Sequence, residues 1–340
     1  MSLPAPVVRL LPQLITLFVI LALNTAISPG FLDIAYQNGR LYGSLIDVVN
    51  RGAPVALLAI GMTLVIATKG IDLSVGAVMA ICGAVAAAAI TGGYSLGATL
   101  GAALGVGLLC GLWNGALVAF FSIQPIIATL ILMVAGRGIA QLITEGVILT
   151  FNDPGLIFLG SGSVAGMPVP VILWVVLGLL VAALVRFTAL GMLIEAIGIN
   201  RRASRLAGIG TSSLLLAVYA ASGLCAAVAG IVAAADIRGA DANNAGLWLE
   251  LDAILAVVVG GNSLLGGRFS IAGSLIGAMI IQSVNTGILL AGFPPEFNLI
   301  IKAAIIVVIL VVQSPTSRSA FGFFGRARER SESRKRSPVR

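Results

Sequence analysis

Long apolar runs separated by short polar segments occupy most of this chain. Ten runs approach the roughly 20 apolar residues that a helix needs to cross a bilayer. Only Gly92, Gly93 and Tyr94 separate the third run from the fourth, and the eighth run is short and rich in glycine. The pattern predicts an all-α, polytopic membrane protein of about ten transmembrane helices, at residues 11–29, 52–68, 73–92, 95–118, 125–144, 169–187, 212–235, 252–267, 270–291 and 297–313.

Composition agrees with lipid as the main solvent. Of the 340 residues, 59% are hydrophobic and 10% are charged, whereas a soluble domain carries about 25% charged residues. The chain has no histidine, which removes histidine-based acid–base catalysis and histidine metal ligands. Cys82, Cys110 and Cys225 are far apart in apolar runs, so we interpret them as small buried hydrophobes. We therefore expect neither an enzyme nor a metal site.

The distribution of charge predicts the orientation of the chain in the membrane. The tail Ser317–Arg340 holds eight Lys and Arg residues, which places it in the cytoplasm by the positive-inside rule and next to lipid headgroups, without a role in nucleic-acid binding. Ten spans place the N-terminus on the same side. Fifteen of the twenty basic residues then lie on cytoplasmic segments. Nine acidic residues fall outside or at the outer interface: Asp33, Asp47, Glu145, Asp153, Asp236, Asp241, Glu250, Asp252 and Glu296.

Small residues indicate how the spans pack. Within lipid, close backbone approach through small residues supplies much of the packing between helices, and such spacing occurs at Gly101/Gly105, Gly107/Gly111/Gly115 and Gly273/Gly277. The fourth and ninth spans also share a pattern of glycine and asparagine followed by proline. Because these spans are five apart, they cross the membrane in opposite directions, which indicates a possible inverted repeat.

Three segments together resemble the permease subunits of ABC importers for ribose-type sugars. They are GIDLSVG at residues 70–76, EAIGIN at 195–200 followed by Arg201 and Arg202, and the stretch from LDA at 251–253 to VGGNSLLGG at 259–267. Within that family, residues 51–80, 128–144 and 234–261 look closest to permeases for galactofuranose. The resemblance implies a type II ABC-importer-like bundle in the bacterial inner membrane. It imports a sugar by alternating access, and this sugar is galactofuranose or, alternatively, ribose or another monosaccharide.

The same resemblance implies an organisation and a set of partners. A transmembrane permease domain covers residues 1–316, with a cytoplasmic coupling segment at about 188–210 and a basic tail at 317–340. The partners are an ATPase subunit, a periplasmic sugar-binding protein and a second permease subunit, with a heterodimer favoured over a homodimer. The chain lacks the phosphate-binding G-x-x-x-x-G-K-[ST] sequence, so the partner hydrolyses ATP and this chain binds no cofactor.

The coupling segment carries most of the interior charge. An amphipathic helix set into a groove of the ATPase would transmit rigid-body movement to the spans, with Ile194, Ile197, Ile199 and Leu206 as its apolar contacts. An ordinary positive-inside loop is the alternative, although it leaves the E-A-x-G-x-N pattern unexplained. The candidate coupling residues are Glu195, Ala196, Gly198, Asn200, Arg201, Arg202 and Arg205.

Polar residues inside spans are the candidates for the translocation pathway, because they are costly in lipid. Arg137 is the foremost, either as a donor to sugar hydroxyls or as a snorkelling or helix-packing arginine. Gln282 and Asn285 share a helix face. Asn114 and Asn262 are explained equally well by hydrogen bonds between helices.

Two further groups of residues have a structural and a functional interpretation. Asp72 and Ser74 are expected as N-caps of the third span or as part of a gate with Gly76. The outer loop at 236–251 offers either a docking surface for the binding protein or an ordinary interfacial belt. Its candidate docking residues are Arg238, Asp241, Trp248 and Glu250.

An ion-coupled secondary transporter is the rival from another class. It needs titratable groups near the middle of the membrane. Only Arg137 and Lys302 are charged residues within the predicted spans, and no carboxylate is expected at the membrane centre.

Overall fold

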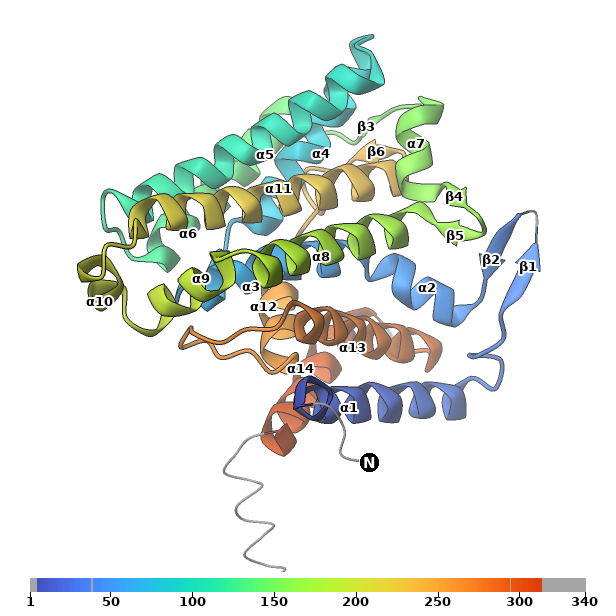
Figure 1. The fold of residues 1–340 in the computed structure, drawn as a ribbon. Coiled ribbons are helices and arrows are strands. Elements are labelled where there is room, and N and C mark those ends of the chain that lie inside the picture. Colours follow the sequence, from blue (N-terminus) through green and yellow to red (C-terminus); the bar gives the residue numbers. More distant parts are fainter. Residues whose placement is uncertain (1–4, 38, 294, 314–340) are drawn as a thin grey trace, which may run out of the picture.

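Helices make up most of the protein in a computed structural model that describes residues 5–37, 39–293 and 295–313 (Figure 1). Each predicted apolar run coincides with one helix. These helices are α1 (Ala5–Ile27), α3 (Ala53–Ala67), α4 (Val75–Thr91), α5 (Leu96–Ala119), α6 (Pro125–Ile143), α8 (Val169–Phe187), α11 (Thr211–Ile237), α12 (Leu249–Val259), α13 (Ile271–Leu290) and α14 (Pro295–Gln313). The prediction of an all-α membrane protein is confirmed. The predicted basic tail lies outside the described residues.

Six helices of the described chain are long and apolar enough to span a bilayer unaided: α1, α5, α6, α8, α11 and α13. Helix α2 (Ser44–Arg51) continues into α3 across a bend of 42° and forms a seventh candidate with it. Helices α4 and α12 are shorter, with 17 and 11 residues. At 1.5 Å per residue, α12 is about 16 Å long, roughly half of the hydrocarbon thickness.

The eighth predicted span differs from the structure. The predicted range is 252–267, but α12 begins at Leu249 and ends at Val259. Gly261, Gly266 and Gly267 adopt positive φ angles of 88°, 74° and 90°, in a region that glycine enters freely and that no helix contains. Residues 260–270 therefore form a loop.

The two ends of the bundle are built differently. Short antiparallel strand pairs gather at one end with α7 (Pro154–Ser161), on the right in Figure 1. Helices α9 (Leu190–Ile199) and α10 (Arg201–Leu206) lie at the opposite end. The pairs are β1 (Ala35–Gln37) with β2 (Arg40–Tyr42), β3 (Leu149–Thr150) with β6 (Gly239–Ala240), and β4 (Ser163–Val164) with β5 (Met167–Pro168).

Helix α11 is the centre of the bundle and packs on α3, α4 and α5. A Cβ added at Gly107 would lie 2.5 Å from the Cβ of Ala227, and one added at Gly115 would lie 3.0 Å from the Cα of Leu216. Helices α5 and α11 therefore run antiparallel with their backbones in close approach. The predicted packing role of Gly107, Gly111 and Gly115 is confirmed, whereas Gly101 and Gly105 face open space in this chain.

Helix α3 runs antiparallel to both α11 and α13. On the α13 side, a Cβ at Gly52 would lie 3.3 Å from the Cβ of Gln282, while Thr63 near the other end donates a 2.6 Å hydrogen bond to Ser274. On the α11 side, Gly61 meets Ser222. Because α5 is also antiparallel to α11, α5 and α13 run in opposite directions. The directions of the fourth and ninth spans thus agree with the predicted inverted repeat.

We expect Gly111→Ala to destabilise the bundle, because its Cβ would lie 2.4 Å from the backbone oxygen of Tyr219. Overpacking against backbone costs about 1–3 kcal/mol or more. Gly105→Ala is the matched control on the same helix, since a Cβ there meets nothing within 4 Å. Thermal unfolding in detergent should show a lower Tm for Gly111→Ala only. Equal Tm values for the two variants would contradict the packing described.

Candidate functional site

Two irregular segments border the first turn of α4 and define the candidate site. Residues 68–74 lead from α3 into α4, and residues 241–248 lead from the α11 end into α12. A Cβ at Gly76 would lie 2.3 Å from the oxygen of Gly246, and one at Gly246 would lie 2.2 Å from the oxygen of Gly76. Gly246 also has a positive φ of 69°. Both positions therefore require glycine for the two backbones to touch.

Four buried polar residues surround the start of α4, and we refer to Asp72, Ser74, Asn114 and Ser222 as the buried polar cluster. The Asp72 carboxylate accepts hydrogen bonds from the Ser74 amide (3.0 Å) and hydroxyl (2.7 Å) through Oδ1, and from the Ser222 hydroxyl (2.9 Å) through Oδ2. Asn114 Nδ2 donates to Ser74 Oγ at 2.7 Å. Asp72 is 2% exposed and Asn114 is 1% exposed. The cluster joins α4, α5 and α11.

The prediction that the Ser74 side chain caps α4 is wrong. Ser74 occupies the N-cap position of α4, but its side chain makes no capping hydrogen bond. Its hydroxyl is used instead by Asp72 and Asn114. Ser222 was missed in the sequence analysis, because a serine within an apolar helix, 150 positions from its partner, carries no local signal.

Carboxylates are buried where the sequence analysis expected none. Glu250 and Asp252, placed at the outer interface by the sequence, are 3% and 7% exposed within α12. Asp252 pairs with Lys302 of α14 at 2.6 Å. Glu250 Oε2 would lie 2.4 Å from a Cβ added to Gly76, and this burial removes Glu250 from any exposed docking surface. Both carboxylates are therefore enclosed within the protein.

Arg137 is engaged with backbone. Its Nη1 donates to the carbonyl oxygens of Ala242 at 3.1 Å and Ala245 at 2.5 Å. Gln141, one turn later on α6, donates to Asn243 at 2.8 Å. Arg137 thus holds the segment that precedes α12, which favours its helix-packing interpretation over that of a sugar donor.

The other predicted pathway residues lie apart from the buried polar cluster. Asn262 accepts a hydrogen bond from the Ser270 amide at 2.6 Å and donates to Ser274 Oγ at 2.9 Å, so it organises the loop at 260–270. Gln282 lies beside Gly52, where α13 meets the start of α3. Asn285 follows on the same helix with no partner for its side-chain oxygen among the described residues. Of the predicted pathway residues, only Asn114 belongs to the cluster.

The segment at 188–210 is anchored to two other elements at the α9–α10 end. A Cβ at Gly198 would lie 1.9 Å from the oxygen of Ala67 and 2.5 Å from the nitrogen of Gly267. The Gly267 amide donates to that same Ala67 oxygen at 2.9 Å. Glycine is therefore the only residue type at position 198 that lets α9 pack on the junction between the end of α3 and the loop at 260–270.

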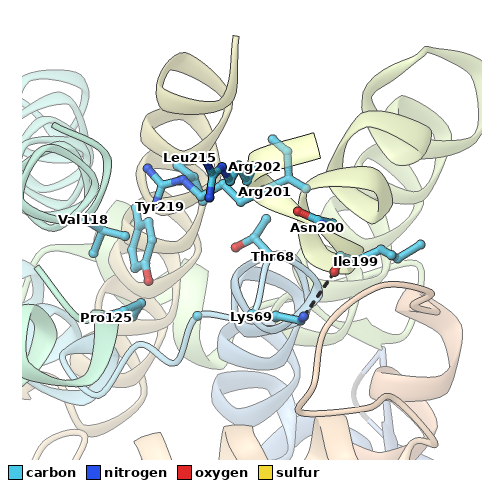
Figure 2. A pocket seen from close by; sticks show the side chains of 12 residues that line it. Thr68, Lys69, Val118, Pro125, Ile199, Asn200, Arg201, Arg202, Leu215 and Tyr219 are labelled. Carbon is cyan, nitrogen blue, oxygen red and sulfur yellow. Dashed lines mark hydrogen bonds between the residues drawn. The ribbon is translucent and has the colours of Figure 1, made fainter. Parts of the chain in front are cut away.

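Side chains extend these anchors (Figure 2). Lys69 donates to the Ile199 oxygen at 3.2 Å, and Arg201 donates to the Ala119 oxygen at the end of α5 at 3.3 Å. Asn200 caps α10 by accepting from the Ala203 amide at 3.0 Å. The junction of α9 and α10 is thus tied to both α3 and α5.

The surface of the segment differs in part from the predicted one. Ile194 and Ile197 are buried against this chain's own helices, whereas Ile199 and Leu206 are exposed. Glu195 and Ala196 are half-buried. Arg201, Arg202 and Arg205 line a hollow of about 490 Å³ with Phe120, Ser122 and other residues. The segment therefore presents a basic surface together with exposed apolar side chains, Ile199 and Leu206 among them.

The segment at 236–251, which the sequence predicts on the outer side, exposes Arg238 and Trp248. Both adopt left-handed φ angles, 54° and 65°, which are uncommon outside glycine. Asp241 accepts hydrogen bonds from Asn243 and Asn244, and the Asn244 side chain lowers the pKa of the Asp241 carboxyl. Three of the four predicted docking residues are thus accessible at least in part, with Glu250 as the exception.

The described residues hold no group of histidine, cysteine, aspartate and glutamate arranged to bind a metal. A bundle of apolar helices with internal polar contacts, and with an anchored segment at 188–210, defines the class of a multi-span membrane protein.

Comparison with known proteins identifies the family. Residues 44–310 match the family described as branched-chain amino acid transport system / permease component, and the chain belongs to this family. It is 62% identical to the galactofuranose transporter permease of Escherichia coli K12, over 89% of each chain. It is 42% identical to the fructose import permease of Bifidobacterium longum NCC 2705 over 89% of this chain and 87% of that one. It is also 37% identical to the ribose import permease of Escherichia coli K12 over 89% and 92%, respectively.

The ion pair between α12 and α14 yields a stability prediction. Asp252→Leu leaves Lys302 buried without its partner, which costs about 3–5 kcal/mol. Asp252→Leu combined with Lys302→Met removes both charges and should restore most of that loss. Thermal unfolding of the purified protein in detergent tests this, with a low Tm expected for the single variant only. A double variant as unstable as the single one would contradict the ion-pair explanation.

Proposed function

We propose that this chain is the transmembrane subunit of an ATP-driven ABC importer for galactofuranose. The observation that carries the proposal is the 62% identity to the galactofuranose permease over 89% of both chains. The ribose and fructose permeases are less similar, at 37% and 42% identity. Ribose or another monosaccharide is therefore the second candidate within the family.

An ion-coupled secondary transporter is the candidate from another class, and the buried carboxylates require that it be considered again. Asp252 is neutralised by Lys302, and Asp72 is hydrogen-bonded to hydroxyl and amide groups. These contacts explain both buried carboxylates as structural groups, so no role in proton transfer is needed to account for them. The relatives are permeases of import systems, which supports the ATP-driven alternative.

The proposed orientation places the α9–α10 end in the cytoplasm of a bacterial inner-membrane protein. Lys69, Arg201, Arg202, Arg205 and Arg268 gather at this end, and the positive-inside rule assigns such a cluster to the cytoplasm. Helix α1 starts at the same end, since Gln13 approaches Gly261. The N-terminus and the basic tail at 317–340 are then cytoplasmic, with the tail next to lipid headgroups. The permease domain spans 1–316.

The partner ATPase binds the coupling segment in this proposal and hydrolyses the ATP, so this chain binds no nucleotide. The exposed Ile199 and Leu206 supply apolar contacts, and the hollow lined by Arg201, Arg202 and Arg205 suits acidic side chains of the ATPase. Gly198 passes the movement on, because it touches the end of α3 directly.

Two further partners complete the proposed importer. The accessible outer residues Arg238, Asp241 and Trp248 provide a mixed surface for the sugar-binding protein. The second permease subunit is a different chain, as the resemblance to galactofuranose systems implies. Within this chain, the pathway runs by Asn114 and the gate contains Asp72, Ser74 and Gly76, where the segment at 241–248 touches the first turn of α4.

The choice of sugar is tested with the complete importer in lipid vesicles. We expect the binding protein loaded with galactofuranose to stimulate ATP hydrolysis at least fivefold, and the ribose-loaded protein to stimulate it less than twofold. Uptake of radiolabelled sugar provides the second measurement. Stronger stimulation and faster uptake with ribose would reject galactofuranose. Uptake that persists without ATP and collapses with an uncoupler would reject the ABC mechanism.

Glu195→Arg should abolish the stimulation of ATP hydrolysis by the loaded binding protein. Glu195 is half-buried in α9, three residues before the Gly198 contact, so a reversed charge there alters the surface that the ATPase binds. Asp33→Arg, an equal charge reversal at an exposed residue outside the coupling segment, is the control. The two variants should elute as the wild-type protein does in size-exclusion chromatography. Normal stimulation in Glu195→Arg would reject the coupling role.

A further inference from the structure

Two buried polar atoms next to Asp72 have no hydrogen-bond partner among the described residues. They are the hydroxyl oxygen of Tyr219 and the side-chain oxygen of Asn114. Tyr219 is 0% exposed and Asn114 is 1% exposed. Leaving a buried polar atom unpaired is unfavourable, and groups of this kind in native structures call for an explanation. The sequence pattern did not predict a role for Tyr219.

Tyr219 lies between a cavity and the buried polar cluster. The cavity has a volume of about 540 Å³, is lined by Thr68, Lys69, Asn200, Arg201 and others, and has the Tyr219 ring in its wall (Figure 2). A Cβ added at Gly70 would lie 2.5 Å from the Tyr219 hydroxyl. Tyr219 is thus packed against the segment that continues, two residues later, to Asp72.

The depth of these residues suits a site within the membrane. Tyr219 and Ser222 lie eight and eleven residues after Thr211, the first residue of α11. At 1.5 Å per residue, these offsets correspond to about 12 Å and 16 Å. The second value is close to the middle of a hydrocarbon layer about 30 Å thick. The cavity opens toward the α9–α10 end, and the cluster lies beyond Tyr219.

The chemistry of the group matches a polyhydroxy ligand. Each sugar hydroxyl is both a donor and an acceptor, like the hydroxyls of Ser74, Ser222 and Tyr219. The carboxylate of Asp72 and the free oxygen of Asn114 accept hydrogen bonds from such hydroxyls. A cavity of about 540 Å³ falls within the range of small-molecule sites, about 300–1,000 Å³.

We propose that the buried polar cluster and Tyr219 form an intramembrane subsite for sugar hydroxyls, closed toward the cavity by the contact of Tyr219 with Gly70. The structure holds this subsite in its closed state, with Tyr219 and Asp72 fully enclosed. When Tyr219 separates from Gly70, a passing sugar hydrogen-bonds to the Tyr219 hydroxyl and the Asn114 oxygen. The proposal rests on the proposed function, since it requires a sugar as cargo.

Removing one hydroxyl tests the subsite in the complete importer. In vesicles supplied with ATP, loaded binding protein and radiolabelled galactose, which includes the furanose form in solution, Tyr219→Phe should lower the initial uptake at least fivefold. The matched control is Ser283→Ala on α13, whose hydroxyl is likewise buried and unpaired among the described residues. Uptake by this control should stay within twofold of the wild type. Normal uptake by Tyr219→Phe, or an equal loss in both variants, would overturn the proposal.

Thiol accessibility separates opening of the subsite from a structural role of Tyr219. In a chain with Cys82, Cys110 and Cys225 replaced by alanine, Ser222→Cys should react with N-ethylmaleimide at least tenfold faster during ATP turnover than at rest. Ser283→Cys, at an equally enclosed position, should stay unreactive in both states. A Ser222→Cys variant that is unreactive during turnover overturns the subsite. Wild-type vesicles that hydrolyse ATP but import no galactose would reject the proposed sugar instead, while the labelling result would still report on the subsite.

Discussion

The absence of water inside a bilayer dictates much of this structure, because every backbone polar group there must find its partner within the protein. The helices are interrupted at 68–74 and at 241–248, and each break leaves backbone amides and carbonyls without helical partners. Arg137 donates hydrogen bonds to the carbonyl oxygens of Ala242 and Ala245. Thr129 of α6 accepts from the Leu73 amide at 3.1 Å and donates to the Ile71 oxygen at 3.3 Å. The polar residues of α6 are thus explained by the breaks that they stabilise.

The first break also joins the two functional regions that we propose. The Ala67 oxygen contacts Gly198 and accepts from Gly267, and the Asp72 carboxylate lies five residues further along the chain. A displacement of α9 therefore reaches the start of α4 through a short stretch of backbone that is largely buried. Packed interiors of this kind shift between discrete arrangements and do not deform continuously, which is the behaviour that alternating access needs.

Hydropathy was sufficient to predict the helices, since each apolar run contains one. It did not predict where α12 ends, because glycines at positive φ stop the helix before the apolar Leu264 and Leu265. It also did not predict the burial of Glu250 and Asp252, which depends on Gly76 and Lys302, residues distant in the sequence. Position on a helix likewise failed to separate buried Ile197 from exposed Ile199, since that difference depends on which neighbours α9 packs against.

A polar residue inside a span indicates function only when the hydrogen bonds that it makes to stabilise the fold do not already explain it. Asn262 organises the loop at 260–270, and Arg137 donates through Nη1 to two carbonyls of the segment before α12, so both side chains have structural roles. Asn114 retains one free oxygen and Tyr219 one free hydroxyl, although both are costly to leave unpaired. Apolar side chains of similar shape serve a purely structural role at least as well. A buried hydrogen-bonding group that has no partner and lies beside a cavity therefore distinguishes a residue of the translocation pathway from one that only stabilises the fold.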